Sequence, residues 1–145
     1  MNYKHSDSVS GLYRANKTKK SVYYDVFKEI FANYQTIKSI YNATKKIDFP
    51  IGDSAVANHV LSNASTISVF ETEMIDYALN WKDYFFEAVP TGTAKIMMAE
   101  IFSLLLDKYS VREVVRQLNV STHTVINSRY VIINIIATKY ESARL

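Results

Sequence analysis

The sequence predicts an all-α fold, and two observations lead to this prediction. Apolar residues recur at intervals of three or four along most of the chain, which is the period of amphipathic helices. No segment shows the sustained alternation of apolar and polar residues that indicates a half-buried strand. We therefore expect a small helical domain of about six helices, ending in two helices that a very short turn joins.

The N-terminal half is predicted to contain an arm and two helices. Residues 1–20 lack a sustained apolar period and are rich in Ser, Asn and Lys, so we expect a flexible basic arm. One apolar face then continues through residues 21–46, which predicts a single long helix. Pro50 and Gly52 interrupt the pattern, and Asp53 can cap a short helix that ends near Asn63.

Two further helices are expected before the final pair. Ser68 and Glu71 have the spacing of a capping box and open a helix that ends near Val89, where Pro90 and Gly92 follow. The next helix extends over residues 93–108. Its expected core residues lie at helical spacing: Ile96, Ile101, Leu104 and Leu105.

The segment SVREVVRQLNVSTHTVINSRYVI, residues 110–132, predicts two helices that meet at an angle, and we call it the elbow. Ser110 and Glu113 have capping-box spacing for the first helix, and Ser121 can cap the second. Asn119 stands where the first helix must end in a left-handed residue, a conformation that Asn tolerates better than other non-glycine residues. Helix, turn, cap and helix in this order form the layout of a helix-turn-helix.

The inward face of the elbow is predicted from its apolar positions. Val120 can fill the angle between the helices. The side chains expected to point inward are Val114, Val115, Leu118, Val125, either Ser128 or Arg129, and Ile132.

The elbow resembles the helix-turn-helix motifs of two known groups of proteins. The run V-V-x-x-L-N-V-S-x-x-T-V, residues 114–125, looks like region 4 of sigma factors and like LuxR-type regulators, although Asn119 stands where these usually have Gly. The preceding run AEIFSLLLDKYS occupies the place of their supporting helix. The layout of residues 34–141 is similar to phage late-gene transcription activators of the RinA and ArpU type. No segment corresponds to the part of a sigma factor that melts promoter DNA, so a complete sigma factor is not expected.

The helix-turn-helix layout predicts a contact surface for double-stranded DNA. The second helix of such a motif enters the major groove, where short polar side chains reach base edges. The residues expected to contact bases are Thr122, His123, Ile126 and Asn127. The residues expected to contact phosphates are Lys108, Arg112, Arg116, Ser121, Thr124, Arg129 and Tyr130. His123 at this position is equally compatible with a solvated surface residue.

Charge is distributed unevenly along the chain, although its net value is only +3. Residues 1–20 contain five Lys or Arg against one acid, residues 21–92 contain five against nine, and residues 93–145 contain seven against four. Basic ends suit contact with a polyanion such as nucleic acid. We therefore divide the chain into the arm, an acidic helical part at 21–92 that offers a partner or dimer surface, and a DNA-binding part at 93–145.

Other classes of function find little support in the sequence. The chain has no cysteine, and no pair of histidines has metal-ligand spacing, so neither a metal site nor a cofactor is expected. The three glycines form no phosphate-binding loop, and no nucleophile motif is present, so we do not expect an enzyme. No signal peptide or membrane-spanning run is recognisable, which predicts a cytoplasmic protein that does not bind membranes.

The sequence thus predicts a sequence-specific transcription regulator, and an activator of phage or mobile-element genes. The sequence leaves open whether RNA polymerase is a further partner. A homodimer is expected because the segment RYVIINIIATKY is apolar on nearly every side, unless the first long helix covers this segment within one chain. Two alternatives remain: the small DNA-recognition subunit of a phage packaging terminase, and a protein-binding module with a degenerate elbow.

Overall fold

A computed structural model describes residues 8–46, 72–89 and 92–145 of the chain. These residues form helices and no strand, which confirms the all-α prediction. Eight helices are present in the described ranges, two more than the approximate number expected. They are α1 Val9–Thr18, α2 Tyr24–Ala32, α3 Tyr34–Lys46, α5 Thr72–Leu79, α6 Trp81–Ala88, α7 Thr93–Leu106, α8 Val111–Leu118 and α9 Thr122–Ala143.

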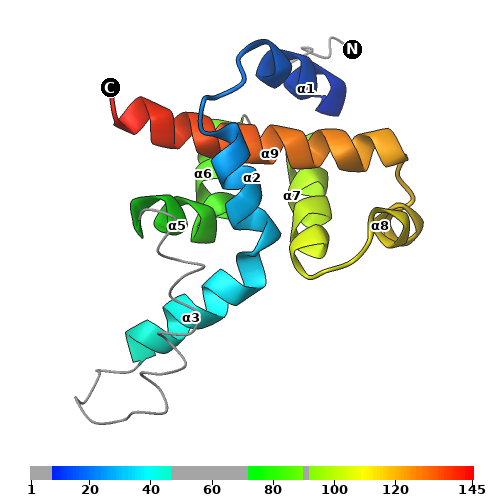
Figure 1. The fold of residues 1–145 in the computed structure, drawn as a ribbon. Coiled ribbons are helices and arrows are strands. Elements are labelled where there is room, and N and C mark those ends of the chain that lie inside the picture. The colour runs from blue at the N-terminus through cyan, green and yellow to red at the C-terminus, as the bar shows by residue number, and fades with distance from the viewer. Residues whose placement is uncertain (1–7, 47–71, 90–91) are drawn as a thin grey trace, which may run out of the picture.

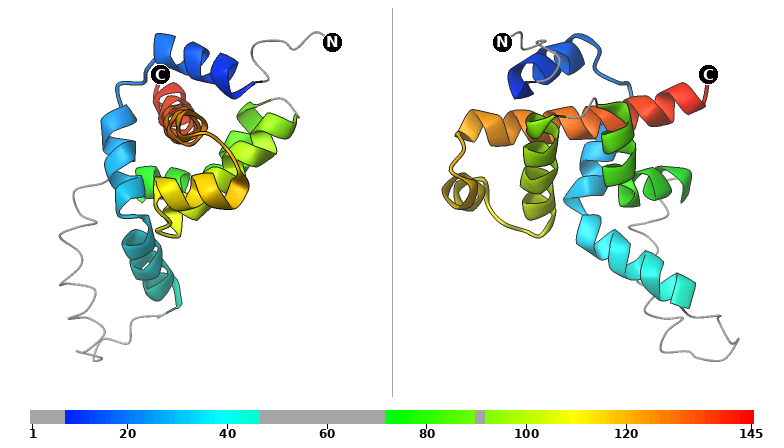
Figure 2. Two further views of the ribbon diagram at one scale, coloured as in Figure 1. Left: turned by 90° about the vertical axis from the view of Figure 1, so that its right-hand side faces the viewer. Right: turned by 180° about the vertical axis from the view of Figure 1, so that it is seen from behind.

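The last helix, α9, is the central element of the fold. It contacts α1, α2, α5, α6, α7 and α8, and Figure 1 shows it extending across the whole molecule. In the left panel of Figure 2, α9 is seen nearly end-on, with α1 on one side and most other helices on the opposite side. α3 contacts α2 and α5 and points away from the centre (Figure 1).

Buried side chains form two clusters of very different size. The larger one joins residues of α1, α2, α3, α5, α6, α7 and α9 and contains many aromatic rings, so we call it the aromatic body. The smaller one lies at the elbow and is built on Ile101, Val114 and Val125, each fully buried. Residues from both 21–92 and 93–145 belong to the aromatic body, so these two segments share one core.

The expectation of a flexible arm is wrong for residues 9–18, which form α1. Ser8 caps this helix, because its Oγ accepts a hydrogen bond from the Gly11 N–H at 2.9 Å. Leu12 is buried, and the Tyr13 ring meets the Tyr130 ring edge-on with centroids 5.4 Å apart. Tertiary packing against α9 therefore orders a segment whose own apolar pattern is weak. Residues 1–7 lie outside the described part.

Two helices that the sequence predicts as continuous are each interrupted at an asparagine. Asn33 separates α2 from α3, and Asn80 separates α5 from α6. The Asn33 Nδ2 donates to the Glu29 carbonyl at 3.0 Å, and the Asn80 Nδ2 donates to the Asp76 carbonyl at 2.9 Å. Asn side chains compete with the backbone for hydrogen bonds in this way and disfavour helix interiors. The break at Asn33 gives α2 and α3 different directions, as Figure 1 shows, while buried residues keep helical spacing across it.

The other expectations for the helices before the elbow are confirmed only in part. α7 ends two residues before the expected Lys108, and Ile101 is fully buried within it. Ile96 is 62% exposed, so its predicted place in the core is wrong. The predicted break at Pro50, the short helix at 53–63 and the cap formed by Ser68 with Glu71 lie outside the described residues. Within the described ranges, no helix is long and apolar enough to cross a membrane.

The apolar segment of α9 is covered within a single chain. Val131, Ile132 and Ile136 are fully buried, and Ile133 is 2% exposed. Their neighbours come from α1, α2, α6 and α7, so several helices, not one folded-back helix, provide the cover. The apolar surface that motivated the homodimer is thus accounted for inside one molecule.

Candidate nucleic-acid interface

Both helices of the elbow begin at side-chain caps that the sequence predicts. The Glu113 N–H donates to Ser110 Oγ at 3.1 Å, and the Ser110 N–H donates to Glu113 Oε1 at 3.1 Å, which completes a capping box. These bonds hold the pKa of the Glu113 carboxyl below its usual value, with the backbone N–H of Ser110 as the largest cause. At α9, Ser121 Oγ accepts the Thr124 N–H at 3.0 Å. Each helix therefore has a fixed start.

The turn between the helices contains one left-handed residue. Asn119 has φ 54° and ψ 49°, as predicted, and the N–H of Val120 donates to the Val115 carbonyl at 3.3 Å. The same carbonyl also accepts the N–H of Asn119, so both residues after α8 are tied to the end of that helix. The direction of α9 relative to α8 is consequently set by local backbone geometry.

A small aliphatic cluster fills the angle between α7, α8 and α9. Ile101, Val114 and Val125 are fully buried, and Leu118 and Val120 pack against them. This confirms the predicted inward positions of Val114, Leu118 and Val125, whereas Ile132 is buried in the aromatic body. Of the two alternatives at the next turn of α9, Ser128 is the buried one and Arg129 is exposed.

The predicted base-contacting residues lie at the start of α9 with different degrees of exposure. Thr122 and His123 are exposed, and Ile126 is 42% exposed. Asn127 is half-buried. Because positions 122 and 126 are one turn apart, they form one continuous strip on the outer side of the helix.

The predicted phosphate contacts lie on the surface of the elbow or next to it, with one exception. Lys108, Arg112, Arg116, Ser121 and Arg129 are exposed, and Thr124 is half-buried. The hydroxyl oxygens of Ser121 and Thr124 are 2.8 Å apart, so both groups belong to the cap of α9.

Tyr130 is the exception among the predicted phosphate contacts. Its ring packs against Tyr13 and Tyr24, with centroid distances of 5.4 and 4.8 Å, and its hydroxyl donates to the Asn16 carbonyl at 3.4 Å. Burial also raises the pKa of Tyr130. This side chain joins α1 to α9, and its placement argues against a contact with phosphate.

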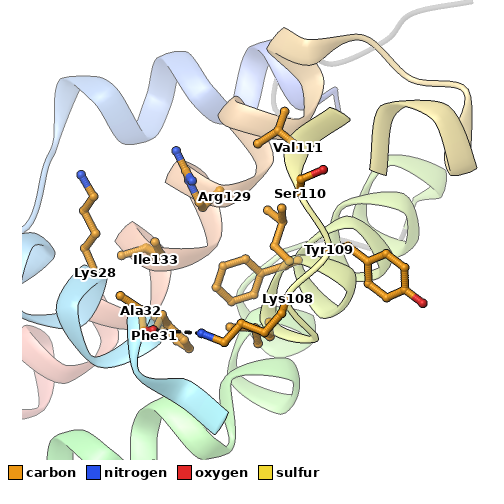
Figure 3. A pocket seen from close by; sticks show the side chains of 12 residues that line it. Lys28, Phe31, Ala32, Lys108, Tyr109, Ser110, Val111, Arg129 and Ile133 are labelled. Carbon is orange, nitrogen blue, oxygen red and sulfur yellow. Dashed lines mark hydrogen bonds between the residues drawn. The ribbon is translucent and has the colours of Figure 1, made fainter. Parts of the chain in front are cut away.

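The structure adds one basic residue that the sequence did not indicate. Lys28 of α2 lines the same pocket as Lys108 and Arg129, as Figure 3 shows. It comes from the acidic segment 21–92 and lies on the exposed face of an amphipathic helix, so nothing in its local sequence distinguished it from a solvated lysine. Only the packing of α2 against α9 brings it near the elbow.

Comparisons with known proteins return no relative. No family model matches the chain, and neither the curated proteins nor the solved structures contain a significant match. Within the described residues, no group of three or more His, Cys, Asp or Glu side chains could hold a metal ion.

Proposed function

We propose that the protein is a sequence-specific DNA-binding transcription regulator that reads the major groove with the first half of α9. The observation that supports this most strongly is the geometry of the elbow. Two side-chain caps and the left-handed Asn119 fix the angle between α8 and α9, and Val114 and Val125 fill it. That arrangement leaves Thr122, His123 and Ile126 facing solvent at the start of a helix.

The exposed strip of α9 suits base recognition chemically. Asn127 could pair with adenine through two hydrogen bonds, and Ile126 or Thr122 could contact a thymine methyl group. A good bidentate pair contributes roughly 1–3 kcal/mol of discrimination between bases. Asn127 is half-buried, so only part of its side chain is accessible to a base.

The charge around the elbow suits the phosphate backbone. Lys108, Arg112, Arg116 and Arg129 are exposed cations, and Glu113 is the sole acid among residues 108–132. The Glu113 carboxylate accepts the Ser110 N–H in the capping box, so it also stabilises the start of α8. The first turn of α9 carries no acid and can offer backbone N–H groups to phosphate.

The resemblance to activators of the RinA and ArpU type is the basis for two further parts of the proposal. These are that the protein activates transcription and that its targets are phage or mobile-element genes. Contact with RNA polymerase belongs to the same proposal. A homodimer is proposed on a different ground, because paired elbows would double the phosphate contacts. If two copies bind together, their half-sites should lie roughly 34 Å apart, one helical turn of DNA. Light scattering distinguishes the packaging alternative, because a ring of eight or more copies would favour a terminase subunit over a regulator.

Selection of bound genomic fragments tests the proposal directly. We expect an enriched sequence motif and an affinity that falls as salt increases. Asn127→Ala should relax base preference at one position of that motif. Arg116→Ala should weaken all sequences about equally and reduce the salt slope by about one unit.

A distant exposed lysine provides the matched control. Lys82→Gln on α6 removes a positive charge outside the elbow, so it should leave both the motif and the affinity nearly unchanged. No enriched fragment and no salt-dependent affinity would instead support a protein-binding module. A motif that Asn127→Ala leaves intact would contradict the role given to that residue.

A further inference from the structure

A pocket of about 400 Å³ opens beside the elbow. Its walls come from α2, from the end of α7 with the turn that follows, and from α9. Figure 3 shows Lys28, Lys108 and Arg129 around it, whereas the Tyr109 side chain points away. Pockets of roughly 300–1,000 Å³ with an apolar lining and a few polar groups are typical of small-molecule sites.

The rim of the pocket carries three cations and no acid. Lys28, Lys108 and Arg129 line it, and no Asp or Glu is among its lining residues. All three are exposed, and none forms a salt bridge with a carboxylate in the part of the chain that the structure describes. Three like charges that line one pocket repel one another, and a bound anion would relieve that repulsion.

The floor of the pocket is apolar. Phe31, Phe102, Leu106 and Ile133 line it, and each belongs to the aromatic body. These four side chains are 1–7% exposed, and the partly buried Leu105 and Val111 add more accessible apolar lining beside them. An aromatic or aliphatic group of a ligand would cover it and gain the free energy of apolar burial.

Lys108 has an unusual backbone conformation that fixes one side of the rim. Its φ is 72°, in the left-handed region that favours glycine, and the N–H groups of Lys108 and Tyr109 donate to Leu105 and Leu104 at 3.1 Å each. From this position the Lys108 Nζ donates to the Ala32 carbonyl at 3.4 Å, across the pocket (Figure 3). The remaining protons of this ammonium group can bind a second acceptor.

We propose that this pocket binds a small organic anion, a phosphate or carboxylate attached to an apolar body. The anionic group lies near Lys28, Lys108 and Arg129, and the apolar body packs against the apolar lining of the pocket, including Leu105 and Val111. A DNA backbone uses the cations alone, since a phosphate on a duplex surface has no apolar group to place on the floor.

The ligand also connects the pocket to the elbow, and this step rests on the proposed function. Lys108 and Arg129 are shared, because both line the pocket and both are proposed phosphate contacts. A bound anion neutralises part of their charge and weakens their attraction for DNA. The ligand therefore acts as a negative effector of DNA binding.

Calorimetric titration of the full chain with phenyl phosphate tests the pocket without DNA. We expect saturable binding to one site, with weaker binding of inorganic phosphate and of phenol, which each lack one half of the ligand. Lys28→Gln and Arg129→Gln should each lower the affinity for phenyl phosphate by about fivefold. Lys82→Gln removes an exposed lysine that does not line the pocket, and it should leave the affinity unchanged.

Several outcomes would overturn the proposal. The proposed site is wrong if phenyl phosphate shows no saturable binding, or if it binds Lys28→Gln and wild type with equal affinity. If inorganic phosphate and phenyl phosphate bind with equal affinity, the apolar floor does not contribute to binding. If phenyl phosphate does not bind but Lys28→Gln weakens DNA, the three cations are a DNA contact instead. If phenyl phosphate binds as expected but no DNA does, the pocket stands and the proposed function fails.

Discussion

The elbow and the aromatic body are stabilised by different kinds of interaction. At the elbow, two side-chain caps and one left-handed residue fix the helices, and only three fully buried aliphatic side chains form the centre of the cluster. In the aromatic body, rings from several helices interlock, for example Phe102 with Phe31 at 5.0 Å and with Trp81 at 4.9 Å. The elbow depends on local hydrogen bonds, whereas the body depends on contacts between distant parts of the chain.

This difference explains how the elbow can hold a fixed geometry while the aromatic body provides most of the buried core. α9 belongs to both regions, since Val125 lies in the elbow cluster and Ile132 and Tyr140 lie in the body. The body holds the second half of α9, and the caps direct the first half. The following predictions test how strongly the two regions depend on each other, beginning with the largest effect.

Phe27→Ala should have the largest effect on stability. Phe27 is fully buried in α2, with its ring 5.6 Å from that of Tyr140 on α9. Truncation of a buried Phe costs about 3–5 kcal/mol, a large part of the stability of a small domain. Urea unfolding followed by the fluorescence of Trp81, the single tryptophan, should show the loss. Val22→Ala changes a side chain that is 83% exposed and should shift stability by less than about 0.5 kcal/mol.

The same experiment tests the coupling of the two regions. Because α9 passes through both clusters, we expect circular dichroism and Trp81 fluorescence to report a single transition. Two separated transitions would show that the elbow unfolds independently of the aromatic body.

Asn134→Leu should have the next largest effect, and it should act on α1. Asn134 is 1% exposed; its Oδ1 accepts the Ser21 N–H at 2.8 Å, and its Nδ2 donates to the Asn16 Oδ1 at 2.9 Å and to the Lys19 carbonyl at 3.2 Å. A leucine side chain leaves these backbone and amide groups without hydrogen-bond partners. Each unsatisfied buried polar group lowers the free energy of unfolding by about 1–3 kcal/mol.

The rates of amide hydrogen exchange in the individual helices test this prediction. Exchange in α1 should accelerate more than exchange in α7 or α8, because Asn16 and Lys19 lie at the end of α1 and just after it. Thr138→Ala changes an exposed residue of the same helix and should leave exchange in α1 unchanged. Uniform acceleration across all helices would contradict a local role for Asn134.

Val125→Ala and Ile126→Ala form an adjacent pair that separates stability from binding. Val125 is fully buried in the elbow cluster, whereas Ile126 is 42% exposed. Val125→Ala should lower stability by about 1–2 kcal/mol and also weaken DNA binding. Ile126→Ala should weaken DNA binding with little loss of thermal stability. Equal thermal losses in the two variants would contradict the assignment of inner and outer faces.

The fold was predictable from the sequence where its signals are local. The caps at Ser110 and Ser121 and the left-handed Asn119 each depend on residues within one turn, and all three were predicted. α1 was missed because its order comes from Tyr130 and Asn134, far away in the sequence. The breaks at Asn33 and Asn80 had a local signal, an asparagine inside an apolar run, but the surrounding helical period concealed it.

The candidate site was predictable to a similar extent. Exposure of Thr122, His123 and Ile126 followed from the helical period of α9. The position of Tyr130 against α1 and the convergence of Lys28 with Arg129 did not, because both require the packing of helices that are distant in sequence. Tertiary contacts, not the period of one helix, determine these two features.

Glu113→Gln should have the smallest effect and should depend on pH. The folded-state pKa of Glu113 lies below its usual value, so its carboxylate stabilises the protein above the unfolded-state pKa. That contribution is lost as pH falls through the lower folded-state pKa. Gln retains an acceptor for the Ser110 N–H but carries no charge, whereas Ala loses both. At pH 6, the melting temperature should therefore decrease from wild type to Gln to Ala. At pH 3, wild type should approach the Gln variant while Ala remains lowest. A gap between wild type and Gln that stays constant or widens towards low pH would show that the charge does not contribute to the cap.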